Sequence, residues 1–281
     1  MPGRAVAEAR EAADYSGVAR VGIDDTARRR GQSHVSVMVG LDGQRAIGVA
    51  EGRDGGAPGR LAEELEAHGG DRLAIREAAR DMSEAHALGA ADALPEAIQT
   101  VDRFHVSQLF SRATDKARCR EARLSEEKGR LLRGTKYCWL RRPENLTGRQ
   151  AARKASLMGE HLLTARACAM SEAMRAVYAC PDRESAGREP DRLVSWTMHS
   201  NVPETRVVAG TVRKEREGIL SWFSRNATNA ILEGLNSIIQ SIKRAARGFG
   251  NVEYFKTMMS LRLGRLDFSA QLAVSSATHQ K

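Results

Sequence analysis

The stretch HVSVMVGL at residues 34–41 constrains the fold of this chain most, because its large apolar residues recur at every second position. That period is typical of a β-strand with one buried face, and it places Val35, Val37 and Val39 together. The turn sequence LDGQ follows, and RAIGVAEG at 45–52 resumes the strand pattern. The order of strand, tight turn and strand predicts a β-hairpin.

The neighbouring segments extend this hairpin into a mixed α/β region over residues 19–105. RVGID at 20–24 has strand character, and the Ala- and Glu-rich stretch at 57–70 is predicted as a helix. Residues 73–94 are ambiguous, with an Ala and Glu content that favours helix, and 97–106 returns to strand character. The predicted order is therefore three strands, a helix, a possible strand, a helix and a strand.

Residues 107–225 differ from this region, because short apolar groups alternate there with dense Arg, Lys, Glu and Ala. This composition predicts an all-helical segment with breaks near 141–148 and 180–190. An amphipathic helix is predicted next, within residues 229–251. On a helical wheel its Ile and Leu residues gather on one side, and Glu233 lies near the centre of the opposite, polar stripe.

The chain carries 44 Lys and Arg against 35 Asp and Glu, a net charge of +9 with a pI near 9.8. This excess favours a polyanionic partner, nucleic acid first and an anionic membrane surface second. The sequence shows neither an apolar run of 18 residues nor the apolar core of a signal peptide, so we expect a cytoplasmic protein without a membrane partner. The four cysteines form no CxxC pair, which argues against a zinc ribbon or a disulfide framework.

Three acids have positions that suit metal-dependent phosphoryl transfer: Asp24 ends the first predicted strand, Asp81 follows the ambiguous segment, and Glu233 lies on the late helix. Two divalent ions about 3.5–4 Å apart stabilise the attacking and leaving oxygens, and oxygen ligands suit Mg²⁺ or Mn²⁺. The spacing alone is weak support, since 35 acids offer many triples and Glu233 can equally be solvated. In VDRFHV, Asp102 and His105 are either metal ligands or hydrogen-bond partners near the site, or a strand-end acid and a structural histidine.

Several stretches together resemble one protein family. VGIDDTARRRG, ARDMSEAH, TVDRFHV, CWLRRPENLT and TNAILEGLNSIIQSIKRAARGFGN occur in the order found in bacterial insertion-sequence transposases of the ISL-three family. The resemblance runs from about residue 18 to about residue 263. It implies a DDE transposase catalytic domain with an α/β fold, a ribonuclease H-like mixed sheet flanked by helices and interrupted by a large all-helical insertion.

The resemblance implies that two Mg²⁺ or Mn²⁺ ions are bound by three catalytic acids, Asp24, Asp81 and Glu233. Family members usually carry Glu after the leading acid, where this chain has Asp25, so the choice between Asp24 and Asp25 stays open. The alternation of side chains along the strand is taken to favour Asp24, as the next step beyond Val21 and Ile23.

The resemblance extends to residues around these acids. Asp102 and His105 match a motif of Cys or Asp, two residues and His, which follows the second acid in related transposases. Asn229 and Asn236 lie about one turn on either side of Glu233, and they either orient it or touch DNA, or serve as a helix cap and a solvated amide. The rest of the polar stripe is expected along DNA phosphates, where each cation adds salt-sensitive affinity: Gln240, Lys243, Arg244 and Arg247.

The predicted domain boundaries follow from the resemblance and from composition. The ribonuclease H-like core comprises 18–106 and 226–263, the helical insertion 107–225, and the ends are a remnant or linker at 1–17 and a tail at 264–281. Family members normally carry an N-terminal zinc ribbon and a helix-turn-helix. Barely twenty residues, without cysteine, precede the first strand here, so we expect a truncated chain.

Three functions remain open from the sequence. The first is a Mg²⁺-dependent transposase that cleaves and transfers strands at insertion-sequence ends, as a homodimer on double-stranded DNA of transposon ends and target, in the cytoplasm or on the nucleoid. The second is a truncated, non-catalytic DNA-binding remnant that inhibits full-length transposase. The third, a ribonuclease H-like nuclease of host origin, does not explain the long helical insertion. We favour the first, because all three acids are retained.

Overall fold

The computed structural model describes residues 2–27, 34–224, 228–246 and 249–269, with the backbone alone at residues 2, 228–230, 232, 233 and 236. The described chain divides into two compact units, which are residues 1–100 with 225–281 and residues 101–224. Each unit is described below by itself.

The first unit is built on a mixed sheet of five strands within the described residues, in the order β3-β2-β1-β4-β5. β1 (Arg20–Ala27) pairs antiparallel with β2 (His34–Gly40), which pairs antiparallel with β3 (Arg45–Glu51). β4 (Glu77–Arg80) pairs parallel with β1, and β5 (Ile98–Val101) lies beyond β4. The predicted hairpin of β2 and β3 is confirmed.

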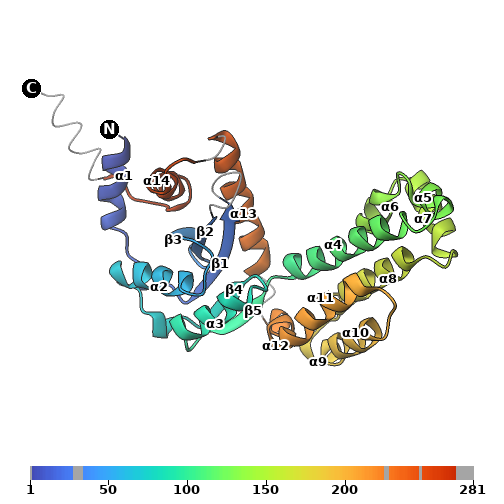
Figure 1. Ribbon diagram of the computed structural model, residues 1–281. Helices are drawn as coiled ribbons and strands as arrows, with labels where there is room; N and C mark the ends of the chain where they lie inside the picture. Colours follow the sequence, from blue (N-terminus) through green and yellow to red (C-terminus); the bar gives the residue numbers. More distant parts are fainter. Residues whose placement is uncertain (1, 28–33, 225–227, 247–248, 270–281) are drawn as a thin grey trace, which may run out of the picture. The chain divides into compact units, whose positions relative to one another are not determined.

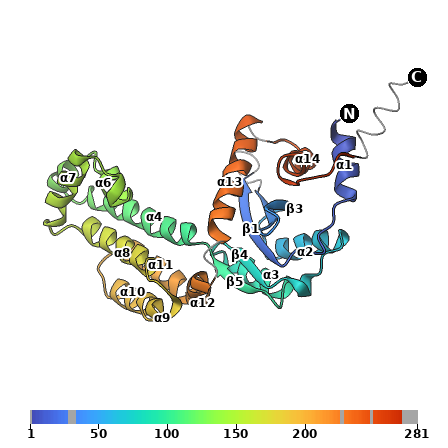
Figure 2. The same ribbon diagram turned by 180° about the vertical axis from the view of Figure 1, so that it is seen from behind.

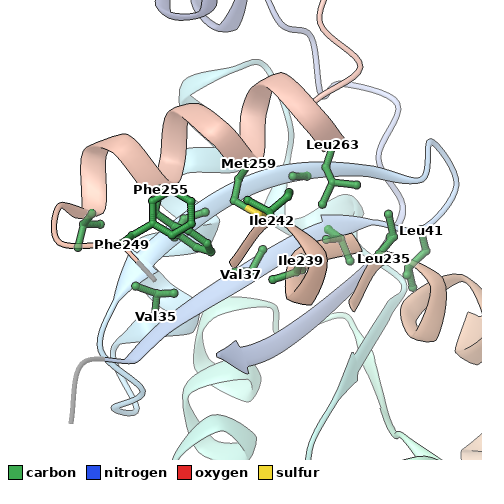
Figure 3. Packing of buried hydrophobic residues seen from close by; sticks show 14 of the residues in the cluster. Val35, Val37, Leu41, Leu235, Ile239, Ile242, Phe249, Phe255, Met259 and Leu263 are labelled. Atoms are coloured by element: carbon green, nitrogen blue, oxygen red, sulfur yellow. The ribbon is translucent and has the colours of Figure 1, made fainter. Parts of the chain in front are cut away.

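Helices cover both faces of this sheet (Figures 1 and 2). On one face, α2 (Ala57–Ala67) and α3 (Glu84–Ala93) enclose a core that includes Val21, Ile23 and Met38. On the other face, α13 (Thr228–Ala245) and α14 (Val252–Leu263) pack on the valines of β2 (Figure 3). The apolar stripe of α13 supplies three buried residues to this second core, Leu235, Ile239 and Ile242, so the predicted amphipathic helix is confirmed.

The segment predicted as a linker or remnant, residues 1–17, contains a helix. α1 (Pro2–Glu11) packs against α14 and buries Val6 and Ala9. Tyr15, which follows it, is buried in the core beneath α2.

β4 is a strand where composition favoured a helix. All four of its residues are buried, with Ala78 in the core beside α2 and Ala79 in the core beside α13. Alanine side chains suit a short central strand covered on both faces, and this burial overrides the helical propensity of Ala and Glu.

The strand predicted over 97–106 is too long, because β5 ends at Val101 and α4 (Arg103–Glu121) begins two residues later. The helix starts there because the Asp102 carboxylate accepts a hydrogen bond from the Phe104 backbone N–H at 2.8 Å. Asp102 is therefore a helix N-cap and His105 lies on a helix, rather than both lying on a strand.

The second unit is helical, as its composition predicts: every regular element of the described residues 102–224 is a helix or a 3₁₀ turn. After α4 come α5 (Glu126–Leu132), α6 (Lys136–Leu140), α7 (Gly148–Met158), α8 (Leu163–Val177), α9 (Arg183–Ala186), α10 (Glu189–Met198), α11 (Pro203–Lys214) and α12 (Arg216–Ser221). The 3₁₀ turns of the chain are η1 (Arg72–Ala74), η2 (Pro143–Asn145) and η3 (Trp222–Ser224). The predicted breaks are confirmed: residues 141–148 contain η2 and separate α6 from α7, and the second break separates α8 from α10 with only the short α9 between them.

A buried carboxylate ties this unit together. Glu121 at the end of α4 accepts hydrogen bonds from the backbone N–H groups of Leu163 and Thr164 at 2.9 and 2.8 Å, and from the Thr164 hydroxyl. Burial alone would raise the pKa of Glu121, but these bonds and Lys128 outweigh it, so the pKa is lowered. Glu121 thus replaces the missing side-chain cap of α8. Among the described residues, no helix combines the length and the apolarity needed to cross a membrane.

Candidate active site beside strands β1 and β4

Two of the predicted catalytic acids occupy matching positions on neighbouring parallel strands. Ile23 of β1 lies opposite Arg80 of β4 in the parallel register. Asp24 and Asp81 are the next residue on each strand path. Because neighbouring strands lie about 4.8 Å apart, the backbones of Asp24 and Asp81 are close neighbours at the end of the β1–β4 pairing.

Asp24 and Asp25 point to opposite faces of the sheet. Asp24 lies opposite Val37, which belongs to the core beneath α13, whereas Asp25 lies opposite Ser36. Residues opposed across a strand pair share a face, so Asp24 faces α13. Glu233 is on α13.

The strand-phase reason for choosing Asp24 was wrong. Val21 and Ile23 lie in the core beside α2, on the face that Asp25 continues and Asp24 does not. Side chains alternate between faces along a strand, so positions 21, 23 and 25 go together. Asp24 is instead favoured as the leading acid because it faces α13. The alternation pattern of the sequence does not predict which face α13 covers.

The surroundings of Asp24 are polar and partly cationic. One of its carboxylate oxygens accepts a hydrogen bond from the Asp25 backbone N–H at 2.8 Å. Two residues further along the same face, the Thr26 hydroxyl lies 2.7 Å from Lys243 Nζ and 3.3 Å from Gln240 Nε2. Burial lowers the pKa of Lys243, and the negative charge of Asp24 opposes that shift.

Of the residues expected along DNA phosphates, Gln240 and Lys243 therefore reach β1. Arg244 is exposed, and its Nε donates to the Gln240 backbone carbonyl oxygen at 3.2 Å. Arg247 lies outside the described residues.

The opposite face holds a cluster that the sequence did not reveal. Asp25 Oδ1 accepts a hydrogen bond from the Ser36 hydroxyl at 2.6 Å and lies 3.3 Å from His86 Nε2. The other ring nitrogen of His86 lies 3.9 Å from Asp81 Oδ1, which in turn accepts from the Ser83 backbone N–H at 2.9 Å. His86 thus stands between the carboxylates of Asp25 and Asp81.

Burial gives this cluster its electrostatic character. The His86 side chain is only 1% exposed, and its Nδ1 has no hydrogen-bond partner within the described residues. Burial raises the pKa of Asp25, the Ser36 hydrogen bond and His86 oppose that shift, and the charge of Asp81 adds to it. The Ser83 backbone N–H and His86 can hold the Asp81 carboxylate in one orientation. The Asp25 carboxylate is contacted by the Ser36 hydroxyl and by His86.

One weak sequence signal marks His86. Ser83 is the N-cap of α3 and its hydroxyl oxygen accepts from the His86 N–H at 3.5 Å, so His86 lies in the first turn after a candidate acid. A side chain in that turn can reach back to the preceding strand end. Its contact with Ser36, at a separation of 50 residues, has no local signature.

The remaining predicted site residues are placed only in part. Glu233, Asn229 and Asn236 belong to α13, but their side chains lie outside the described part of the chain. Asp102 and His105 belong to the helical unit, where Asp102 Oδ2 lies 3.5 Å from His105 Nδ1 and Asp102 is 4% exposed.

The chemistry of the donor set fits a hard divalent cation. Asp24 and Asp81 offer carboxylate oxygens at adjacent strand positions, which are the ligands that Mg²⁺ and Mn²⁺ prefer. Among the described side chains, no group of three or more His, Cys, Asp and Glu lies close enough to hold a metal ion. The third proposed ligand, Glu233, is not part of that described set.

Curated transposases are similar in sequence over most of the length of this chain. It is 26% identical over 275 residues to the transposase for insertion sequence element IS1557 of Mycobacterium tuberculosis, covering 89% of this chain and 61% of that protein. It is 24% identical over 246 residues to the transposase for insertion sequence element IS1001 of Bordetella parapertussis, covering 86% and 60%. The chain thus spans about three fifths of the length of these curated relatives.

The profile of one family, described as a transposase family of the ISL3 (ISL-three) type, matches residues 21–259. That range includes all of the sheet but Arg20, the whole helical unit and most of α14. The chain therefore belongs to the ISL3 family of insertion-sequence transposases.

Proposed function

We propose that this chain is the catalytic domain of a DDE-type transposase that cleaves and joins DNA strands at the ends of an insertion sequence, with Mg²⁺ or Mn²⁺ as cofactor. The observation that carries the proposal is the register of β1 and β4, which sets Asp24 and Asp81 side by side on neighbouring parallel strands. A mixed sheet with the third acid on a late helix is the arrangement expected of a ribonuclease H-like core.

The three acids have distinct structural supports. Asp24 is held on the α13 face of β1, and Asp81 is oriented by the Ser83 N–H with His86 beside it. Glu233 lies two helical turns before Gln240 on the same stripe of α13, and Gln240 reaches β1. Two divalent ions, when bound by these acids, would stabilise the charge that develops on the attacking and leaving oxygens.

The reaction has two in-line displacements at phosphorus. In the first, a water oxygen attacks the phosphodiester at the element's end, the bond from phosphorus to the 3′ oxygen breaks, and a free 3′-hydroxyl is released. In the second, that 3′-hydroxyl attacks a phosphodiester of target DNA, one bond to phosphorus forms and one breaks. The number of phosphodiester bonds is conserved in the second step, so no external energy source is needed.

The surrounding residues have supporting roles in this proposal. Gln240, Lys243, Arg244 and Arg247 contact phosphates of double-stranded DNA beside the acids. Asn229 and Asn236 orient Glu233, and Asp102 with His105 forms an auxiliary pair. The protein acts in the cytoplasm as a homodimer on paired element ends. The core comprises 18–106 and 226–263, with 107–225 as the insertion.

The proposal is tested with the full chain and a supercoiled plasmid that carries the DNA flanking its coding sequence. Asp81→Asn and Glu233→Gln should each reduce Mn²⁺-dependent nicking at least about 1,000-fold, equivalent to roughly 4 kcal/mol of transition-state stabilisation. Asp92→Asn, at an exposed position of α3, is the matched control and should nick like the wild type.

Binding of Mn²⁺, followed by electron paramagnetic resonance without DNA, supplies a second readout. The proposal requires weaker Mn²⁺ binding by Asp81→Asn and Glu233→Gln, and unchanged binding by Asp92→Asn. A wild-type chain that binds the plasmid but neither binds Mn²⁺ nor nicks would instead be a non-catalytic DNA-binding remnant.

A further inference from the structure

The two ends of the helical unit differ in charge. The segment that carries α5, α6 and α7, residues 126–158, contains nine Lys and Arg against three Glu, a net charge of +6. The segment from α9 to α12, residues 183–221, contains seven Lys and Arg against six acids, a net charge of +1. The first segment, here called the α5–α7 subdomain, therefore carries about two thirds of the chain's net charge of +9.

The α5–α7 subdomain is a packed structure, not a loose tail. Its core joins Leu132, Trp139 and Leu157 with residues of α8. The Trp139 indole N–H donates to the Thr135 hydroxyl at 3.0 Å. A capping box between Thr147 and its N3 residue fixes the start of α7. The cations of this subdomain are thus presented from fixed helices, in one cluster of elements at one end of the unit (Figures 1 and 2).

The lysines of this subdomain have acidic partners. Lys128 Nζ lies 3.2 Å from Glu121 and Lys136 Nζ lies 3.4 Å from Asp115. Lys154 pairs with Glu172. Each of these lysines ties the subdomain to α4 or α8 and so has a structural role.

The arginines differ from the lysines. Of six arginines, only Arg130 lies within ion-pair distance of a carboxylate among the described residues, at 3.9 Å from Glu126. The other five are exposed and have no carboxylate partner within the described chain: Arg133, Arg141, Arg142, Arg149 and Arg153. Arg149 and Arg153 are also neighbours at i and i+4 on α7, a like-charge spacing that destabilises a helix by a few tenths of a kcal/mol.

We infer that the α5–α7 subdomain is a second DNA-binding surface, which contacts the phosphate backbone of duplex DNA through these five arginines. The planar guanidinium matches two phosphate oxygens at once, which suits arginine at these exposed positions that lack an acidic partner. Single strands are usually bound on several exposed aromatic rings. In this subdomain Tyr137 is 55% exposed, but the Arg141 guanidinium already lies 5.1 Å from its ring centroid. This arrangement favours duplex DNA over a single strand as the ligand. The choice of DNA as the polyanion rests on the proposed function.

Three of the arginines allow a clean substitution. Arg133, Arg142 and Arg149 make no side-chain hydrogen bond or ion pair within the described residues, so replacing them removes charge without removing an internal contact. Arg141 and Arg153 are left in place, because they donate to Gln150 Oε1 and to the Leu131 carbonyl oxygen. The control variant replaces three exposed arginines of the segment 183–221, namely Arg183, Arg188 and Arg192. Arg183 and Arg192 are paired with acids.

The test measures binding of the full chain to a fluorescent duplex of about 30 base pairs in EDTA, which prevents cleavage, over a series of KCl concentrations. The triple variant Arg133→Gln, Arg142→Gln, Arg149→Gln should bind roughly 10- to 100-fold more weakly near 0.1 M KCl. Its slope of log affinity against log salt should be smaller by about 2.7, since each phosphate contact contributes about 0.9. Circular dichroism melting checks that the fold is retained.

The triple variant Arg183→Gln, Arg188→Gln, Arg192→Gln should stay within about threefold of the wild type, although its net charge changes equally. Equal losses in both variants, or no loss in the first, would overturn the inference, as would tighter binding to a single strand or to anionic vesicles. Binding is measured in EDTA, where no cleavage occurs, whereas catalysis is measured by Mn²⁺-dependent nicking, so a failure of catalysis is distinguishable from a failure of this surface.

Discussion

The two faces of β1 give consecutive aspartates different surroundings. Asp24 faces α13, with Lys243 nearby, and accepts a hydrogen bond from the Asp25 backbone N–H. Asp25 faces α3, where the Ser36 hydroxyl donates to it and His86 lies 3.3 Å away. The comparison teaches that two consecutive aspartates of one strand face different helices, and we propose that the one facing the late helix is the metal ligand.

The face of β1 that is covered by α3 also contributes to the site through polar contacts. His86 connects the half-buried Asp25 to the neighbourhood of Asp81, so a substitution on the α3 face should change the support of Asp81. We therefore expect Asp24 to act directly on the metal ions, and Asp25, Ser36 and His86 to act through Asp81. Substitutions of Asp24 should therefore reduce activity more than substitutions of Asp25, Ser36 or His86.

The largest effect should separate Asp24 from Asp25. Asp24→Asn should reduce Mn²⁺-dependent plasmid nicking at least about 1,000-fold, because a metal ligand is lost. Asp25→Asn should cost roughly 10-fold, because an amide still accepts from Ser36 and only the support of His86 is altered. Nicking rates of the two variants measured side by side decide the matter, and a reversed order would assign the leading acid to Asp25.

The next effect concerns His86 as a positioning residue. His86→Phe keeps a buried ring but removes both nitrogens, so Asp81 loses a neighbour at 3.9 Å and the Mn²⁺ concentration for half-maximal nicking should rise roughly 10-fold. His86→Gln, which restores one amide, should recover part of this. His68→Phe is the matched control, since His68 lies near Glu64 and away from these acids. A Mn²⁺ requirement that moves equally in both Phe variants would indicate a loss of packing only.

The smallest effect is a pH-dependent loss of stability in Ser36→Ala. Burial raises the pKa of Asp25, so ionising it costs stability as pH rises from an unfolded pKa of about 3.9 through the folded pKa. The Ser36 hydrogen bond reduces that cost by stabilising the ionised form. Ser36→Ala should therefore lose roughly 1–2 kcal/mol more in urea unfolding at pH 7.5 than at pH 4.

The double variant with Asp25→Asn supplies the control for that effect. In the Asp25→Asn background no carboxylate titrates at this position, so Ser36→Ala should lose the same stability at both pH values. A pH-dependent difference that persists there would place its origin elsewhere.

The antiparallel part of the fold was readable from sequence because its signals are local. Alternation in β2 and the turn before β3 depend on adjacent residues, and both are found as predicted. The amphipathic α13 was equally readable, since its Ile and Leu residues recur at helical spacing. The helical composition of 107–225 also produced helices.

β4 was predicted only as a possible strand, and the start of α4 was predicted as strand, for different reasons. The sequence EAAR has no strand preference, and only burial between two layers makes it a strand. The start of α4 had a local signal that was overlooked, because Asp102 is a good N-cap two residues before Phe104. At the site, the pairing of Asp25 with Ser36 and His86 depends on register between distant segments.

The most direct test of the account is a crystal structure of the chain grown with Mn²⁺, with the ions located by anomalous scattering. The account predicts Mn²⁺ about 2.0–2.3 Å from carboxylate oxygens of Asp24 and Asp81, with Glu233 completing the site and Asp25 outside it. Mn²⁺ bound between Asp25 and Asp81 on the α3 face, or ions with no contact to Asp24, would contradict it.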